Sequence, residues 1–161
     1  MDKELLREHL RGMLDEEARL LAQLETLLEH EAEVLKTDDL PEIERIGAQR
    51  HRCVSALMRI DSERRVMCRM QGISEEREHF ESLLAHCDPG GTLRQRWQDG
   101  LAAAARCKDR NERNGAIVSA KLRRVESLLV QLRGGTNTAA PTYAATGQRK
   151  LEGRGLELGR A

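Results

Sequence analysis

The sequence predicts an all-α protein, an elongated antiparallel bundle of long, coiled-coil-like helices with a flexible C-terminal tail. Three observations support this fold class. Aromatic residues make up 2% and charged residues 34% of the 161 residues, which is typical of long helices. Apolar residues recur at heptad spacing, and turn-forming residues interrupt that pattern in few places. We therefore divide the chain into a helical domain, residues 1–135, and a tail, residues 136–161.

The first predicted helix covers residues 4–36 and carries two neighbouring heptad columns. One column is Leu6, Met13, Leu20, Leu27 and Val34, and the other is Leu14, Leu21, Leu28 and Leu35. Together they form a wider apolar band than the single seam of a two-stranded coiled coil. We therefore expect two other helices to cover this one.

A turn at residues 37–39 separates the first helix from the second. Asp39 and Glu42 match the capping-box pattern that begins a helix. Arg50 and Arg64 interrupt the apolar face of this second helix. We expect their aliphatic stems to cover apolar surface while their guanidinium groups reach acidic residues of the first helix.

Two further breaks define the remaining helices. Gly72 precedes a short apolar segment, and no helix can pass through the Asp-Pro-Gly-Gly sequence at residues 88–91. The last helix runs from Thr92 to Arg133, roughly 60 Å at 1.5 Å per residue. Its small-residue run, residues 101–105, either allows another helix to approach closely or leaves a shallow groove.

Charge is unevenly distributed, although the formal net charge is +0. Residues 1–48 hold 6 Lys/Arg and 14 Asp/Glu, whereas residues 92–135 hold 10 and 4. These opposite charges predict that the first and last helices pack side by side. A basic helix could instead bind nucleic acid, but the neutral chain and its scarce aromatic residues argue against that.

The sequence contains no pattern that predicts catalysis or a metal site. Its cysteines, Cys53, Cys68, Cys87 and Cys107, form no CxxC pair, and no phosphate-binding glycine loop occurs. The charged start of the chain lacks the apolar core of a signal peptide, and no apolar run approaches the roughly 20 residues of a membrane span. We therefore expect a cytoplasmic protein with buried, reduced thiols that is not an enzyme and has no cofactor or integral membrane segment.

The second half of the last helix has an apolar stripe that two asparagines interrupt. The stripe consists of Val118, Leu122, Val125, Leu129 and Leu132. Asn111 and Asn114 lie where further aliphatic residues are expected. A buried Asn in a heptad seam fixes register at some cost in stability, so these two residues have either that role or a direct role in binding. We predict a polar layer against the first or second helix, and a higher melting temperature or changed oligomeric state when both become Leu.

A motif in the last third of the chain resembles the FlgN family of flagellar type III export chaperones. The motif is Asn114-Gly115-Ala116-Ile117-Val118, then a leucine-bearing helix end, a short spacer, and Thr142-Tyr143 with Gly147-Gln148. The general helix layout agrees over most of residues 1–148. The family usually reads Tyr-Gly-x-x-Gly-Gln, whereas this chain has Ala144 in place of the first glycine.

The resemblance implies a cytosolic chaperone that binds the C-terminal segments of the hook–filament junction proteins FlgK and FlgL. Such a chaperone prevents their premature association and delivers them to the export gate protein FlhA. On this basis the expected client-binding residues are Asn111, Asn114, Ile117, Val118, Leu122 and Val125, and the expected gate-docking residues are Tyr143, Gly147 and Gln148. The alternative is a helical coiled-coil scaffold or structural adaptor that self-associates without releasing a client.

Overall fold

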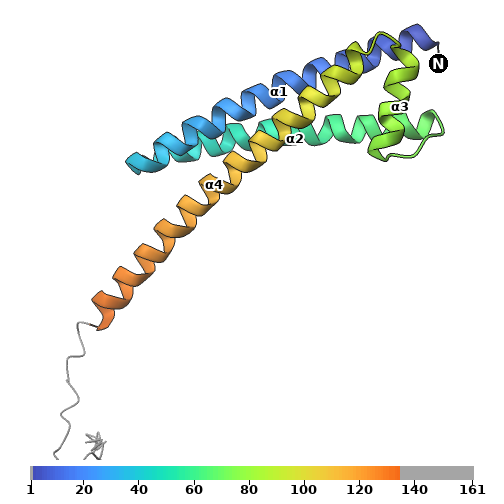
Figure 1. The fold of residues 1–161 in the computed structure, drawn as a ribbon. Helices are drawn as coiled ribbons and strands as arrows, with labels where there is room; N and C mark the ends of the chain where they lie inside the picture. Colours follow the sequence, from blue (N-terminus) through green and yellow to red (C-terminus); the bar gives the residue numbers. More distant parts are fainter. Residues whose placement is uncertain (1, 135–161) are drawn as a thin grey trace, which may run out of the picture. The chain divides into compact units, whose positions relative to one another are not determined.

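The computed structural model describes residues 2–134, which form four α-helices and no strand (Figure 1). The helices are α1 (Lys3–Thr37), α2 (Leu40–Met70), α3 (Arg77–Cys87) and α4 (Thr92–Gly134). The predicted all-α class is confirmed. Tyr143, Gly147 and Gln148 lie outside the described residues. Contacts divide the chain into two units, residues 1–122 and 123–161.

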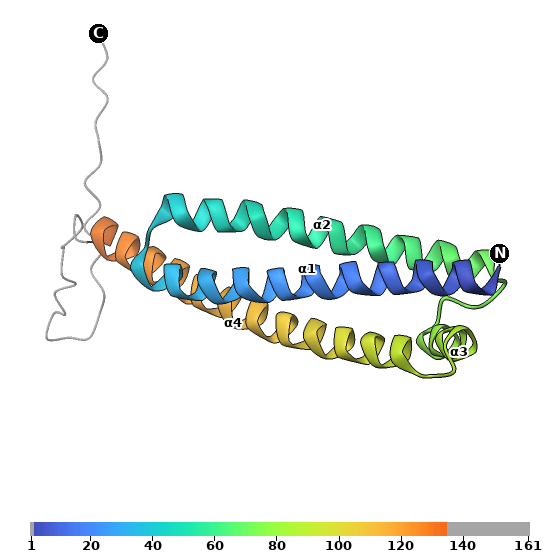
Figure 2. The same cartoon turned by 90° about the horizontal axis from the view of Figure 1, so that it is seen from above.

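Helix α1 is buried along the predicted band, and α2 returns beside it in the opposite direction (Figures 1 and 2). Every residue of the two heptad columns is buried except Leu27, which is partly buried. Asp38 ends α1 in the left-handed conformation, at φ 58°. The Asp39 carboxylate then accepts a hydrogen bond from the Glu42 backbone N–H at 3.2 Å, a cap that stabilises a helix by about 1 kcal/mol.

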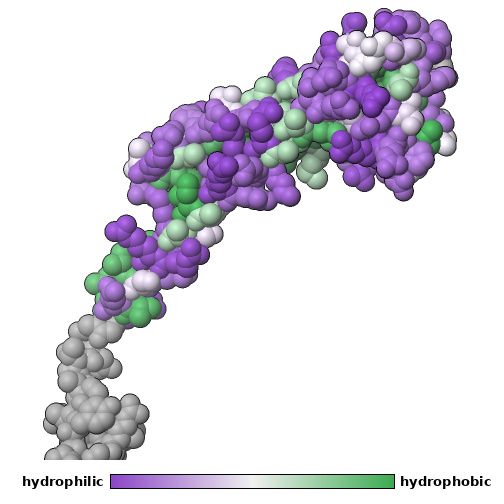
Figure 3. All heavy atoms as spheres, in the orientation of Figure 1, coloured by the Kyte–Doolittle hydropathy of each residue, from purple (hydrophilic) through white to green (hydrophobic). Residues whose placement is uncertain are grey.

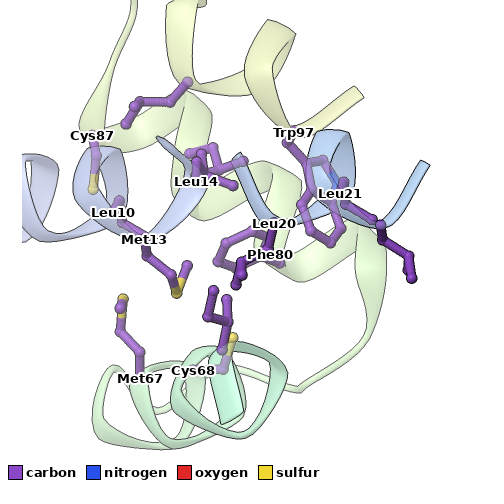
Figure 4. Close-up of a cluster of buried hydrophobic side chains, with 14 of the residues drawn as sticks. Leu10, Met13, Leu14, Leu20, Leu21, Met67, Cys68, Phe80, Cys87 and Trp97 are labelled. Carbon is purple, nitrogen blue, oxygen red and sulfur yellow. The ribbon is translucent and has the colours of Figure 1, made fainter. Parts of the chain in front are cut away.

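Helix α3 closes one end of this hairpin through an aromatic contact with α4. Gly72, at φ +69°, ends the turn after α2, and α3 then brings Phe80 against Trp97 of α4. The two ring centroids are 5.0 Å apart with the rings at 72°, the edge-to-face geometry that aromatic pairs prefer. Both side chains lie among apolar residues of α1 and α2 (Figure 4). This junction fixes where α4 begins.

Arg64 takes part in the same junction, and it reaches α1 through its charge, which acts on Glu17, rather than through a close ion pair. Its guanidinium carbon lies 5.4 Å from the centroid of both the Phe80 and the Trp97 ring. It also donates a hydrogen bond to Asp61 of its own helix. A guanidinium stacks well on aromatic faces, which sequence spacing alone cannot indicate when the aromatic residues come from other helices.

The first part of α4 packs beside α1, as the opposite charges of these helices predict. Arg106 binds Glu25 at 2.9 Å and Arg110 binds Glu29 at 2.8 Å. Further ion pairs join Arg96 to Asp15 and Lys121 to Asp38. These contacts commit much of the basic surface of α4 to α1, which weakens the nucleic-acid alternative. Within residues 2–134, none of the helices has an apolar stretch long enough to cross a membrane.

Candidate functional site

Four side chains from three helices form a polar layer, which we define as Glu31, Arg50, Asn111 and Asn114. Asn114 is 4% exposed, and its Nδ2 donates to the Glu31 carboxylate at 2.8 Å and to the backbone carbonyl oxygen of Leu28 at 2.9 Å. Arg50 Nε lies 3.6 Å from the same carboxylate. Arg50 Nη1 donates to Asn111 Oδ1 at 2.7 Å. The predicted layer is therefore present, and it joins α4 to both other long helices.

The two asparagines have different environments within this layer. Asn114 points into the seam with α1, whereas Asn111 is exposed and reaches α2 through Arg50. Glu31 is only 7% exposed, and a buried carboxylate is costly unless its oxygens are paired. Moving α4 by one turn would remove the Asn114 donor from Glu31. The layer therefore sets the register of α4 on α1.

An open groove lies between α2 and α4, with α1 as its floor. Its volume is about 430 Å³, and its floor consists of Leu21, Leu24 and Leu28. Val54 of α2 and Ala104 of α4 are on opposite walls. The small-residue run at residues 101–105 was predicted either to allow another helix to approach closely or to leave a shallow groove. The structure has the groove, because the short side chain of Ala104 does not fill the space between α2 and α4. Apolar surface also interrupts the hydrophilic surface of the helices in the space-filling view (Figure 3).

A second hollow of about 580 Å³ continues the groove toward α1 residue Glu17. The two hollows share four lining residues, Leu21, Val54, Leu57 and Ala104. The full groove therefore runs along α2 from Gly47, in the first hollow, to Arg65, in the second. Met58 of α2 lines the second hollow and is 66% exposed.

The two ends of the groove differ in charge. Arg50, His51 and Lys108 line the first hollow, which has no acidic lining residue. Glu17 and Asp61 line the second hollow together with Arg65. Burial raises the pKa of the Glu17 carboxyl. Burial also acts to raise the pKa of Asp61, but hydrogen bonds from Arg64 and Arg65 outweigh it and lower that pKa.

The expected client-binding residues of the first unit differ in exposure along α4. Asn114 is buried and Ile117 is partly buried, whereas Val118 is 40% and Leu122 is 59% exposed. Val118 lies four residues after Asn114, on the same side of the helix, but Lys121 already pairs with Asp38, the residue that follows the end of α1. We accordingly assign Asn114 to register rather than to direct contact with a client.

The described part of the second unit is the end of α4, residues 123–134. Its exposed apolar side chains include the predicted client residue Val125, at 52% exposure. The others are Leu128, Leu129, Val130 and Leu132. These side chains form an apolar surface that the described residues leave uncovered.

Analysis of the sequence did not identify the α2 wall of the groove. The sequence pattern does not place Val54 or Met58 in any predicted site. A usable signal exists, because Val54 and Met58 are four residues apart and form an apolar edge beside the buried Cys53. All four cysteines are buried and free, as expected. Residues 2–134 contain no cluster of His, Cys, Asp and Glu that could hold a metal ion.

Comparison with known proteins agrees with the resemblance found in the sequence. The sequence model described as FlgN protein matches residues 1–150. No curated protein and no solved structure matches the chain. Because the match covers all four helices and more than half of the sequence, the chain belongs to the FlgN family, whose members are flagellar chaperones.

Proposed function

We propose that this protein is a cytoplasmic chaperone of the flagellar type III export system. In this proposal it binds the C-terminal segments of FlgK and FlgL, prevents their premature assembly, and delivers them to the export gate protein FlhA. The observation that carries the proposal is the exposure of apolar heptad residues on α4. In the first unit Val118 and Leu122 are 40% and 59% exposed, although their spacing is that of residues that normally pack against another helix. In the second unit Val125 is 52% exposed.

An amphipathic client helix is the partner that suits such residues. A helix of this kind buries anchors at i, i+3, i+4 and i+7 spacing, and burying a Val or Leu side chain contributes about 1.5–3 kcal/mol. A segment that folds only on binding spends part of this free energy on its own ordering. The resulting moderate affinity favours release, which an export chaperone requires.

The charges beside these residues favour a different protein over a second copy of this chain. Arg123 and Arg124 are basic, and Glu126 is the nearby acid. Two copies pairing through this surface would bring like charges together, whereas an acidic client would neutralise them. Light scattering with and without a FlgK C-terminal peptide separates the alternatives. A chaperone shifts to a defined complex, and a self-associating scaffold does not.

The test of client binding is a double substitution, Val118→Asp with Leu122→Asp. We expect it to abolish binding of FlgK and FlgL segments in calorimetry, because two anchors become charged. Leu5→Asp with Val66→Asp is the matched control, since those residues are 57% and 45% exposed on other helices. Circular dichroism must show that both variants keep their helicity. Normal binding by the folded double variant would move the site elsewhere.

Delivery to the gate is the part of the proposal that depends on the tail. We propose Tyr143, Gly147 and Gln148 as the FlhA contact, with the tyrosine ring as an aromatic anchor. The support is the family membership of the chain and the match of these residues to the family motif.

A further inference from the structure

We infer that the groove between α2 and α4 binds an additional helix, which is an amphipathic segment of the client. The C-terminal end of this segment carries carboxylates and lies at Arg50, His51 and Lys108. This inference rests on the proposed function. It adds to that function a second contact for the same client, with α2 as one wall and Lys108, ten residues before Val118, on α4, and it gives the helix bound there a direction.

The first argument is the shape and chemistry of the groove. Its floor residues Leu21, Leu24 and Leu28 are 4%, 8% and 2% exposed, so α1 offers a closed apolar base rather than a deep cavity. The exposed apolar area is on the rim, where Val54 is 38% and Met58 is 66% exposed. A helix laid between α2 and α4 would cover both rim residues and contact the floor with its apolar face.

The second argument is the charge difference along the groove. A helix has a partial positive charge at its N-terminus and a partial negative charge at its C-terminus. A bound segment is therefore stabilised when its C-terminal end, with any carboxylates there, faces Arg50 and Lys108. Its N-terminal end then faces Glu17 and the Asp61–Arg65 pair, so Glu17 is the acidic residue of the second hollow that has no basic partner among the lining residues. In this direction the segment runs parallel to α1 and to α4.

Lys108 can bind a carboxylate of the client because its ion pair with Glu112 is weak. Its Nζ lies 3.9 Å from Glu112 in a pair whose side chains are 78% and 64% exposed. Exposed pairs of this type contribute little to stability, so a client carboxylate can replace Glu112. A second copy of this chain is the less suitable occupant, because the apolar end of its α4 is basic and would meet the cationic end of the groove.

The first experiment changes the groove without touching Val118 or Leu122. Lys108→Glu should weaken binding of the FlgK and FlgL C-terminal segments at least fivefold at low salt, with the effect shrinking as salt rises. Arg113→Glu is the matched control, because it makes the same charge change on α4 and also breaks an exposed i, i+4 pair, with Asp109. Val54→Asp, checked for helicity, should weaken binding independently of salt.

The outcomes separate this inference from the proposed function. If the unchanged protein does not bind either segment, the proposed function fails. If it binds, and Lys108→Glu and folded Val54→Asp bind equally well, the groove inference is overturned while the proposed function stands. The inference is also overturned if these variants change self-association but not client binding, because the occupant is then a second copy.

The direction of the segment can be measured through Trp97, the single tryptophan of the chain. On α4 it lies eleven residues before Lys108, about 16 Å along the helix axis at 1.5 Å per residue. A Trp-free client segment is labelled with dansyl at either its N- or its C-terminus. We expect stronger energy transfer from Trp97 to the N-terminal label. Equal transfer, or stronger transfer to the C-terminal label, would overturn the proposed direction.

Discussion

Replacing Asn114 with Leu tests whether the polar layer stabilises the bundle. From the sequence alone, replacing both asparagines by Leu is expected to raise the melting temperature or change the oligomeric state. The structure changes the expected sign for Asn114, because its side chain is the donor to the buried Glu31 carboxylate. The single substitution removes that donor and leaves the carboxylate in place. A buried acceptor that loses its partner costs more than the net value of the hydrogen bond.

The magnitude follows from the two hydrogen bonds that are lost. The bond from Asn114 to the Leu28 carbonyl contributes about 0.5–1.5 kcal/mol, and the bond to the charged Glu31 about 1.5–3 kcal/mol. The buried Leu regains about 1–2 kcal/mol of transfer free energy. The midpoints of these ranges give an expected net loss of about 2 kcal/mol in the free energy of unfolding. For a chain of this size that lowers the melting temperature by roughly 4–8 °C.

The assay is urea unfolding followed by circular dichroism, with a double-mutant cycle. Glu31→Leu combined with Asn114→Leu should recover most of the loss, because replacing both buried partners by apolar groups is often neutral or stabilising. Gln98→Leu is the control on α4, since Gln98 is exposed and its change should stay within about 0.5 kcal/mol. The reasoning is refuted if Asn114→Leu unfolds at the same urea concentration as the unchanged protein, or if the two single losses simply add.

Two further predictions concern the tail and the charges between α1 and α4. Tyr143→Ala should leave the melting temperature and FlgK or FlgL binding unchanged while FlhA binding and filament assembly fall, and a destabilised fold with normal gate binding would contradict this. Hydrogen bonds from Arg106, together with the charges of Arg106 and Arg110, lower the pKa of Glu25 below its ordinary 4.5. A lowered carboxyl pKa stabilises the folded state above pH 4.5, and that contribution is lost as pH falls through the lowered value. Glu25→Gln should therefore reduce the loss of folding stability at acid pH. Glu8→Gln, at an exposed position of α1, should not change that loss. Equal pH dependence of the two variants would show that the ion pairs of Glu25 with Arg106 and Arg110 do not contribute to stability.

The helices could be predicted from the sequence because their signals are local. Heptad spacing identified the buried columns of α1, and the capping residues at Asp39 placed the start of α2. The polar layer was predictable as a layer, since two asparagines in an apolar stripe are conspicuous. Its partner Glu31 was not, because α1 has many acidic residues and nothing in their spacing shows which of them is buried.

The groove could not be predicted for a different reason. The groove depends on the separation of α2 from α4. The junction of Arg64, Phe80 and Trp97, which lies outside the groove, influences that separation. These three residues come from three helices, so no local pattern connects them. The small-residue run of α4 left open whether another helix fills the space or a groove remains. Only the position of α2 decides between these outcomes.

The polar layer, together with the end of α1, explains why the apolar residues of α4 in the first unit stay exposed. Asn114 binds Glu31, six residues before α1 ends at Thr37, and Lys121 pairs with Asp38, the residue that follows α1. Val118 and Leu122 therefore lie where α1 ends, and hydrophobic burial by itself would favour a shift of α4 along α1 that covers them. The same shift would withdraw Asn114 from Glu31 and Asn111 from Arg50. The hydrogen bonds of the layer thus oppose the shift, and the stability they contribute keeps an apolar surface available for the proposed client.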